Sequence, residues 1–403
     1  MHFKFTTAGE SHGKALVAIL EGCPAGLAID FDAITEQLRR RQTGYGRGRR
    51  MAIESDRAEP LSGIRHGHTT GGPIALMIPN KDWENWQRTM YVEAEVPAGA
   101  PGAERPSVTR PRPGHADLAG YVKYGHDDMR NVLERASARE TAARVAVGAI
   151  ARQLLGQVGT DVVSHVVSIG AAVISNPLDL RYEQVQSIGW DAPLHCADPE
   201  VERRMIAEID NAREAGDTMG GSFEVIAHDV PPGLGSYVQW DRKLDGRLAQ
   251  ALMSIPAIKA VAIGRGPIVA NLPGSRVHDE ILPQAGPGRK SPVSVRRPTN
   301  NAGGLEGGVT NGEDVRITGY MKPISTLMKP LRSVDLATMT ESPATIERSD
   351  VCAVPAAAVV GEAMVAFVLA DAAVEKFGGD SIDELVANWR AFLDRTWARF
   401  DRR

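Results

Sequence analysis

The longest apolar stretch of the sequence, residues 351 to 374, constrains the fold more than any other feature. Pro355, Glu362 and Asp371 interrupt it, and a membrane-spanning helix rarely carries acids in its interior. We therefore predict a helix that is buried inside the protein. With 403 residues and 43% hydrophobic content, the chain can surround such a helix as two or three average domains or as one large α/β unit.

The charge balance limits the partners of this chain. Its 46 Lys and Arg against 50 Asp and Glu give a formal net charge of −4, so any basic site must be local. Cys23, Cys196 and Cys352 are odd in number and far apart, which argues against a disulfide framework and against a zinc site. No metal is expected. The N-terminus lacks the apolar segment of a secretory signal, so we expect a cytoplasmic protein in a reducing compartment.

The remaining pattern predicts alternating strands and helices. Strands are expected near residues 2–8, 15–20, 160–174, 222–228 and 258–264, and helices near residues 33–41, 198–213 and 244–253. Asp32 is expected to cap the first helix, with Ile34 and Leu38 on its inner face. The alternation favours an α/β protein.

Residues 109–117 read TRPRPGHAD and combine stiff backbone with reactive side chains. Pro111 and Pro113 fix their own φ angles, and Gly114 allows a sharp turn before His115. We interpret the stretch as a rigid mount for an anion clamp, Arg112, and for a proton-transfer group, His115. An ordinary proline-rich loop with a solvated histidine is the alternative.

Glycines also flank the short segment Glu10-Ser11-His12, between two apolar runs. They indicate a tight crossing where the backbone can approach a ligand, with His12 projecting from the bend. A bulge with a surface histidine fits the same pattern.

Arginines gather within residues 39–50 of this net acidic chain. They are Arg39, Arg40, Arg41, Arg47, Arg49 and Arg50. Glycines between the later arginines let several guanidinium groups converge on one phosphorylated or carboxylated ligand. Nucleic acid is the alternative anion, but arginine- and glycine-rich segments that bind it are usually longer, repetitive and set in a basic context.

A second anion site is predicted where a helix begins at Ser137. Ser137 and Glu140 have the spacing of a capping box. The apolar positions that follow recur at helical spacing: Ala143, Val147, Ile150 and Leu154. Arg135 and Arg139 flank the helix N-terminus, where backbone N–H groups favour a phosphate. A capped helix with solvated arginines is the alternative.

Two later segments add groups that could contact a ligand. Residues 298–325 are rich in glycine, and Lys322, Ser325 and Thr326 supply one charge and two hydroxyls, which suit a phosphate or ring carbonyls. The segment lacks the Gly-Lys-Ser/Thr of a Walker loop. Near the apolar helix, Arg348 and Asp350 place a base beside an arginine.

Residues 79–106 carry Trp83 and Trp86 among many Pro and Gly and are predicted to form a long excursion at the surface. Loops of this length are typical of lids or of contacts with another subunit. His66 and His68 form a His-x-His pair, which could in principle bind a metal ion. No carboxylate or cysteine accompanies them at the spacing of metal ligands, which argues against a metal site there.

Several blocks of the sequence, in this order, resemble the chorismate synthase family. They are residues 9–13 (GESHG) with 21–24 (EGCP), 44–51 (GYGRGRRM), 112–117 (RPGHAD), 134–141 (ERASARET), 301–304 (NAGG), 322–326 (KPIST) and 348–352 (RSDVC) with Glu362. The agreement spans nearly the whole chain, apart from a looser segment at 79–106. The resemblance implies a β-α-β sandwich of helices and antiparallel sheets, one large domain over residues 1–403, and a homotetramer.

The resemblance also implies a reaction. Members of the family convert 5-enolpyruvylshikimate-3-phosphate into chorismate, the last common step of the shikimate pathway, by an anti-1,4 elimination of phosphate. They require reduced FMN although the reaction has no net redox change. Carried over by motif, His12 would protonate the departing phosphate, His115 would lie against the flavin, and Asp350 would act through flavin N5 on the C6 proton.

The same resemblance implies the binding residues. Substrate would be held by Arg47, Arg50, Arg139 and Arg348. The flavin or nicotinamide cofactor would be held by Arg41, Arg47, Arg112, Arg135, Ala136, Ser137, Pro256, Ala257, Gly307, Lys322, Pro323, Ile324, Ser325, Thr326 and Arg348. Arg41 and Arg47 match positions that contact NADP in members that bind it, so NADPH is a candidate reductant. Because the arginines of one pocket repel each other, we expect loops that become ordered on binding.

Two other functions are open at this stage. An NADPH-dependent FMN oxidoreductase would share the FMN and anion sites but would consume one reduced nicotinamide per turnover. An arginine-rich nucleic-acid-binding module would bind with a steep salt dependence, and the net charge of −4 disfavours it. The resemblance implies neither nucleic acid nor membrane as a partner.

Overall fold

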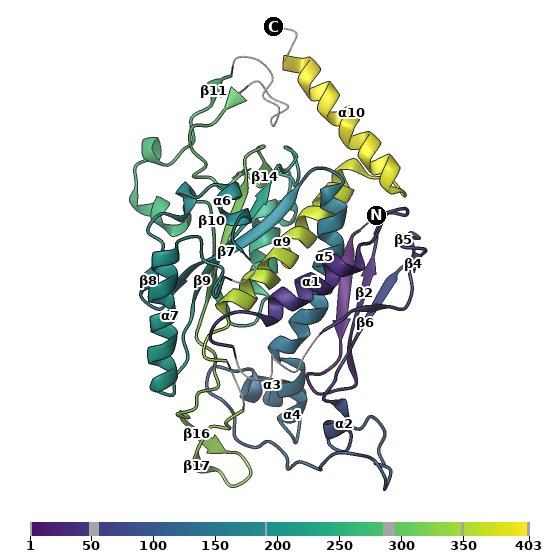
Figure 1. The fold of residues 1–403 in the computed structure, drawn as a ribbon, viewed down its shortest axis with the longest axis vertical. Helices are drawn as coiled ribbons and strands as arrows, with labels where there is room; N and C mark the ends of the chain where they lie inside the picture. Colours follow the sequence, from purple (N-terminus) through teal and green to yellow (C-terminus); the bar gives the residue numbers. More distant parts are fainter. Residues whose placement is uncertain (1, 48–55, 190–191, 285–294, 348–349, 401–403) are drawn as a thin grey trace.

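Two antiparallel sheets lie on either side of a layer of helices in the computed structural model (Figure 1). The structure describes residues 2–47, 56–189, 192–284, 295–347 and 350–400. Among these residues, the pairings between named strands are all antiparallel. The arrangement of sheet, helices and sheet agrees with the predicted sandwich.

The first sheet is built from the N-terminal part of the chain. Its strands, in spatial order, are β1 (Lys4–Ala8), β2 (Ala15–Glu21), β6 (Ile74–Pro79) and β3 (Glu59–Pro60). Leu16, Ala18 and Leu20 alternate with more exposed residues along β2 and lie in the core, as the period of a strand requires. The two predicted N-terminal strands are confirmed.

The second sheet is built from the middle of the chain. Its strands, in spatial order, are β10 (Ile258–Ile263), β15 (Val315–Met321), β9 (Gly221–His228), β7 (Asp161–Ile169) and β8 (Ala172–Val173). Six consecutive residues of β9, from Ser222 to Ala227, are buried, because helices cover both faces of this central strand.

Two long helices form the layer between the sheets. α5 (Thr141–Gly156) packs on β2 of the first sheet, and α9 (Val354–Phe377) packs on β7 and β9 of the second. A Cβ atom at Gly148 would lie 2.3 Å from the Cβ of Ala363, so the absence of a side chain there lets the two helices touch. α1 (Phe31–Gln42) and α8 (Leu244–Met253) flank this pair.

α9 is the buried helix that the apolar stretch predicts. It is long and apolar enough to cross a membrane by length and composition, yet 89% of its apolar window is buried inside the protein. Its neighbours α5, β7, β9 and α8 supply that cover. α9 is therefore the core helix around which the layers are assembled.

The other elements are short or peripheral. The short strands are β4 (Ile64–Arg65), β5 (His68–Thr69), β11 (Leu282–Pro283), β12 (Val295–Arg296), β13 (Leu305–Glu306), β14 (Val309–Thr310), β16 (Arg332–Asp335) and β17 (Thr340–Pro343). The helices are α2 (Trp83–Trp86), α3 (Asp117–Tyr124), α4 (Arg130–Arg135), α6 (Tyr182–Gln186), α7 (Pro199–Glu214) and α10 (Ile382–Phe400).

Two predicted helix starts are wrong. Asp30, and not Asp32, caps α1, since its carboxylate accepts the backbone N–H groups of Asp32 and Ala33. Helix α5 begins at Thr141, after a 3₁₀ turn over Ala138–Glu140. Ser137 caps that turn by accepting from the backbone N–H of Arg139.

The second error has a physical cause. The Glu140 carboxylate accepts from the Thr7 hydroxyl at 2.9 Å and from Arg144 Nε at 3.1 Å. It is therefore used for tertiary contacts with β1 and along α5, instead of completing a capping box with Ser137.

A buried ion-pair network crosses the helix layer at Glu362 of α9. The Glu362 carboxylate accepts from Arg40 at 2.5 Å, from Arg152 at 2.7 Å and from the Ser164 hydroxyl at 2.7 Å. Burial alone would raise the pKa of Glu362, but the charges of Arg40 and Arg152 overcome that effect and hold it at about 2. One carboxylate thus joins α1, α5, β7 and α9.

We predict that Glu362→Gln destabilises the fold by about 3–5 kcal/mol near pH 7, because two guanidinium groups stay buried without their carboxylate. Urea unfolding measures the loss. The matched control is Glu341→Gln, which removes one partner of the exposed Arg332–Glu341 pair and should change stability by no more than about 0.5 kcal/mol.

The pH dependence gives a second readout. Because the folded-state pKa of Glu362 is depressed, its contribution is present above the unfolded pKa of about 4.5 and is lost as the pH falls toward 2. The difference in the free energy of unfolding between wild type and Glu362→Gln should therefore be smaller at about pH 3.5 than at pH 7. A difference that does not change with pH would contradict this role of Glu362.

Candidate active site

The proline-rich stretch forms the rigid turn that its sequence predicts. Gly114 has a φ of 80°, and the backbone N–H of His115 donates to the carbonyl of Arg112 at 3.2 Å. The stretch lies along the β16–β17 hairpin, where the Ser333 hydroxyl donates to the carbonyl of Pro111. The turn therefore presents Arg112 and His115 from a braced backbone.

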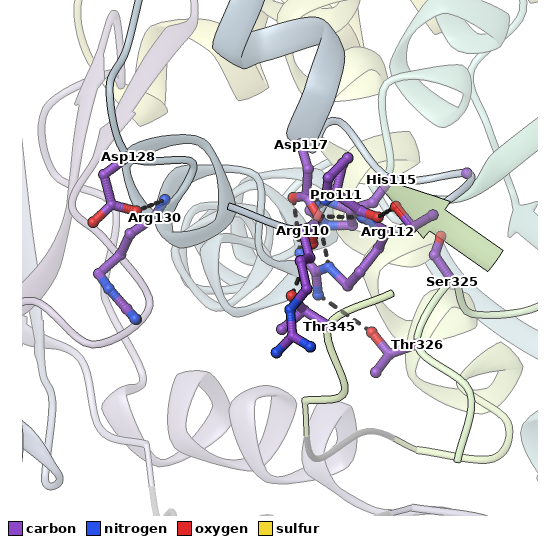
Figure 2. Close-up of polar contacts among 12 residues, drawn as sticks. Arg110, Pro111, Arg112, His115, Asp117, Asp128, Arg130, Ser325, Thr326 and Thr345 are labelled. Carbon is purple, nitrogen blue, oxygen red and sulfur yellow. Dashed lines mark hydrogen bonds and ion pairs between the residues drawn. The ribbon is translucent and has the colours of Figure 1, made fainter. Parts of the chain in front are cut away.

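Asp117, the first residue of α3, organises both side chains. Its fully buried carboxylate accepts from Arg112 Nε at 2.8 Å and lies 2.6 Å from His115 Nδ1 (Figure 2). Burial favours the protonated acid, yet the hydrogen bonds from His115 and Arg112 hold the pKa of Asp117 well below its usual value. Nδ1 of His115 therefore faces a carboxylate, and its Nε2 atom lies 3.3 Å from Arg112 Nη2.

The structure changes the expected role of Arg112. Its Nε and Nη2 atoms bind Asp117, and its Nη1 atom donates to the Thr326 hydroxyl at 3.2 Å (Figure 2). The guanidinium is thus fixed by an internal carboxylate, and it connects the His115 turn to the segment after β15.

That segment, residues 322–326, approaches the same turn. Lys322 Nζ donates to the carbonyl of Gly114 and to the Ser325 hydroxyl, both at 2.9 Å. Burial and the nearby Lys259 lower the pKa of Lys322. The Lys322 backbone N–H donates to the carbonyl of Ala257 at 3.0 Å, and Pro256 is the preceding residue. Five of the predicted cofactor positions, residues 322–326, therefore lie next to His115 and Ala257.

His12 lies at the turn between β1 and β2. Gly9 makes the turn possible, since its φ is 103° and a Cβ there would lie 2.4 Å from the carbonyl oxygen of Ala15. The buried Glu134 carboxylate accepts from the backbone N–H of His12 at 2.8 Å and lies 2.9 Å from its Nδ1 atom. As in His115, the carboxylate contact at Nδ1 fixes the orientation of the imidazole ring.

The helix start that follows Glu134 joins this turn. The Ser137 hydroxyl donates to that of Ser11 at 3.2 Å. The exposed Arg135 side chain donates to the carbonyl and hydroxyl of Thr7 at 3.1 and 2.9 Å, and Ala136 lies between Arg135 and Ser137. The predicted anion site is thus beside His12, although its first turn is 3₁₀.

Three arginines from different elements form a guanidinium cluster: Arg41, Arg47 and Arg139. Arg41 and Arg139 share the buried carboxylate of Asp56, at 3.1 and 2.6 Å. Burial lowers the pKa of Arg41; Asp56 opposes that effect, and the charges of Arg139 and Arg47 add to it. Burial would raise the pKa of Asp56, but Arg139 and Arg41 lower it below its usual value.

Arg47 extends the cluster to the entry of α9, where its Nη1 atom lies 2.6 Å from Asp350 Oδ2. Arg41, Arg47 and Arg139 thus lie against the carboxylates of Asp56 and Asp350. The Nε atom of Arg41 is buried and has no hydrogen-bond partner within the described part of the chain. A buried guanidinium N–H of this kind suits a phosphate or carboxylate ligand.

Backbone hydrogen bonds tie these clusters together. The Val351 N–H donates to the carbonyl of Gly46 at 2.9 Å, and the Met219 N–H donates to that of Val351 at 2.8 Å. The neighbouring Thr218 hydroxyl donates to the carbonyl of Ile324 at 2.8 Å. The segments that carry Arg47, Asp350 and Lys322 are therefore neighbours although they are far apart in sequence.

Three of the predicted site residues are not among the described residues of this site. Arg50 and Arg348 lie outside the described residues. Gly307 lies in the β13–β14 hairpin near Tyr237, before the start of β15, whereas Lys322 follows its end. The seven residues of β15 separate the two by about 20 Å, and Figure 1 shows β14 in the upper half of the view and β16 near its lower end.

A hollow of the described surface lies elsewhere. It has a volume of about 350 Å³ between α1, α5 and the start of β7. Its guanidinium group, Arg152, is already paired with Asp161 and Glu362, so the hollow lacks the charge that a polyanion requires. It contains none of the predicted site residues.

Sequence analysis missed the residues that hold the site together. Asp56, Asp117 and Glu134 lie in or near the quoted blocks but were not assigned a role, and Trp86 was not assigned one either. The spacing of Asp117, two residues after His115, was a usable signal. The contacts of Asp56 with Arg139, and of Glu134 and Trp86 with His12, each span more than 70 residues of sequence, which no local pattern reveals.

The arrangement is that of an acid–base enzyme for a small, multiply anionic molecule. Two histidines are each held at Nδ1 by a buried carboxylate, and the guanidinium cluster is part of the same site. The scaffold is a layer of helices between antiparallel sheets.

Comparison with known proteins agrees with this class. The family model described as "Chorismate synthase" matches residues 3–374. The chorismate synthase of Moorella thermoacetica is 56% identical over 403 residues, covering 97% of this chain and 99% of that protein. The chorismate synthase of Carboxydothermus hydrogenoformans is 53% identical over 391 residues, covering 97% of this chain and 98% of that protein.

A solved structure supports the same relation. A crystal structure of chorismate synthase matches with a TM-score of 0.77 and 42% sequence identity, covering 99% of each chain. The chain therefore belongs to the chorismate synthase family, whose members are lyases. The predicted fold class, with helices and antiparallel sheets, is confirmed.

We predict that Asp56→Asn destabilises the protein by about 3–5 kcal/mol near pH 7, because Arg41 and Arg139 then repel each other without compensation. Phosphate should restore part of the loss by replacing the missing negative charge. Thermal unfolding in phosphate and in chloride at equal ionic strength measures both effects.

The control for this experiment is Asp241→Asn, at an exposed aspartate in the 3₁₀ turn just before α8. Because the pKa of Asp56 is lowered in the folded protein, its contribution is present above the unfolded pKa of about 3.9 and is lost on acidification below it. If phosphate stabilised the Asp56 variant no more than the control, the role of Asp56 as the charge that balances Arg41 and Arg139 would be refuted.

Proposed function

We propose that this protein catalyses the anti-1,4 elimination of phosphate from 5-enolpyruvylshikimate-3-phosphate to give chorismate, with reduced FMN and no net redox change. Family membership supports the reaction. The observation that carries the proposal is the pair of histidines, each oriented through Nδ1 by a buried carboxylate, next to the guanidinium cluster.

The leaving phosphate requires a proton donor. His12 is suited to this role because Glu134 lies 2.9 Å from Nδ1 and fixes the orientation of the imidazole ring. We assign His12 as the group that protonates the phosphate through Nε2. Its place beside Ser137 and Arg135 gives it an environment of hydrogen-bond donors for phosphate oxygens.

The substrate carries one phosphate and two carboxylates, and the guanidinium cluster supplies the opposite charge. At about 4 Å and an effective dielectric constant near 20, one such contact contributes roughly 4 kcal/mol before desolvation. We assign Arg47 and Arg139, with Arg50 and Arg348 beyond the described residues, to substrate. Arg47 also orients Asp350 through their 2.6 Å contact, and we assign Asp350 as the group that receives the proton lost from C6.

FMN suits the part of the site that lies around the His115 turn and residues 322–326. The residues that would hold it are Arg112, Arg135 to Ser137, Pro256, Ala257 and Lys322 to Thr326, with His115 against the ring. The Lys322 charge and the Ser325 and Thr326 hydroxyls suit its phosphate and carbonyl groups. Bound reduced FMN supplies the electron-rich group that a non-acidic C6–H bond requires and that side chains lack.

The chain presents a surface that suits assembly. Tyr237, Val238 and Trp240 are 78%, 64% and 83% exposed and lie near the hairpin that contains Gly307. Exposed apolar side chains of this density mark interaction surfaces. We propose a homotetramer in the cytoplasm, with the Gly307 region of one copy serving a neighbouring site, and neither nucleic acid nor membrane as a partner.

The proposal is tested by phosphate release under anaerobic conditions with dithionite-reduced FMN. Wild type should release one phosphate per substrate consumed. His12→Ala, His115→Ala and Asp350→Asn should each lower kcat by about 10²–10⁴-fold, the range for a lost acid or base. Normal turnover in all three variants would remove these assignments.

The same assay separates the alternative function. An NADPH-dependent FMN oxidoreductase would oxidise one nicotinamide per product. The proposed lyase should instead convert many substrate molecules with the same bound reduced FMN, because the cofactor is not consumed. Nicotinamide absorbance followed beside phosphate release gives the ratio. Whether NADPH serves as the reductant of FMN, through Arg41 and Arg47, is read from flavin bleaching by NADPH alone.

A further inference from the structure

The indole of Trp86 is stacked on the imidazole of His12. The ring centroids are 3.8 Å apart and the planes are inclined by 20°. Trp86 is the last residue of α2 and only 7% of it is exposed. The segment 79–106 was expected to be a surface excursion, yet it delivers a buried aromatic ring to the face of a proposed catalytic group.

The indole is itself held from several directions. Its Nε1 atom donates to Asp82 Oδ2 at 2.9 Å. The guanidinium carbon of Arg105 lies 3.9 Å from the ring centroid and that of Arg130 lies 5.5 Å from it. Arg130 belongs to α4, which also carries Glu134, the partner of His12. Contacts from both ends of the segment and from α4 therefore fix where the ring lies.

The start of the segment is fastened to the turn that carries His12. Asn80 Nδ2 donates to the carbonyls of Ser11 and Gly13, at 2.5 and 3.0 Å, and the backbone N–H of Asn80 donates to the carbonyl of Lys14 at 3.1 Å. Asn80 is 6% exposed. Asn80, at the start of the segment that carries Trp86, thus holds the turn between β1 and β2 by hydrogen bonds on both sides of His12.

We propose that Trp86 is a positioning residue for His12. This inference rests on the proposed role of His12 as proton donor. Glu134 holds the Nδ1 edge of the imidazole, but a bond at one edge still allows the ring plane to swing about that contact. The indole limits this swing by covering one face, so Nε2 stays in one direction, toward the departing phosphate. The aromatic face also attracts the positive imidazolium that must exist before the proton is given up.

The first test compares three variants in the phosphate-release assay. Trp86→Leu should lower kcat by about 10- to 100-fold, a part of the full general-acid contribution, with KM changed by less than about threefold. Trp86→Phe keeps an aromatic face and should stay within about threefold of wild type. Trp83→Leu, at the other tryptophan of the same helix, is the matched control and should be unaffected.

A double-mutant cycle shows whether Trp86 acts through His12. In the His12→Ala background, Trp86→Leu should cause no further loss of kcat. An equal loss in both backgrounds, or a loss in Trp83→Leu as large as in Trp86→Leu, would overturn the proposal. If His12→Ala itself were fully active, the proposed function of His12 would fail; a slow His12→Ala beside a normal Trp86→Leu overturns only the positioning role.

A measurement without catalysis keeps the proposal testable if Trp86→Leu does not fold. In proton NMR spectra of the protein labelled with ¹³C-histidine, the signal that disappears in His12→Ala should be shifted upfield by the ring current of the stacked indole. Trp86→Phe should retain most of the shift. An unshifted His12 signal in wild type would show that the rings are not stacked in solution and would overturn the proposal.

Discussion

Buried carboxylates control where the cationic groups of this protein can lie. Three of these carboxylates each hold two partners: Asp56 holds Arg41 and Arg139, Asp117 holds Arg112 and His115, and Glu362 holds Arg40 and Arg152. Glu134 holds His12. Two guanidinium groups at about 4 Å repel each other by roughly 4 kcal/mol at an effective dielectric constant near 20. A carboxylate between them turns this repulsion into attraction and fixes the geometry of both side chains.

The helix pair at the centre of the fold makes these buried pairs possible. α5 and α9 touch at Gly148 and Ala363, and the ends of this pair carry site residues: Ser137 and Arg139 precede α5, and Asp350 precedes α9. Glu362, in the middle of α9, holds the same helices to α1, whose last turn bears Arg41. The stability of the core and the position of the guanidinium cluster therefore depend on the same packing.

Local chemistry explains which features could be predicted from sequence. The apolar run of α9, the alternation of β2 and the turn at Gly114 depend on residues close together in the chain, and they form as expected. The predicted start of α5 was wrong because a tertiary contact competed with a local one: Glu140 accepts from the Thr7 hydroxyl of β1. The role of Arg112 was incomplete for a similar reason, since its partner Thr326 lies 214 residues away.

The sequence by itself determined the family, the histidines, and the clusters of arginine and glycine, because these are properties of residue type and short spacing. Only the tertiary structure decided which carboxylate holds each of these cations and that Trp86 covers His12. It also placed Gly307 and Lys322 at opposite ends of β15. The physical reason is that ion pairing and stacking act over a few ångströms in space, and the partners meet only when the sheets and helices have packed.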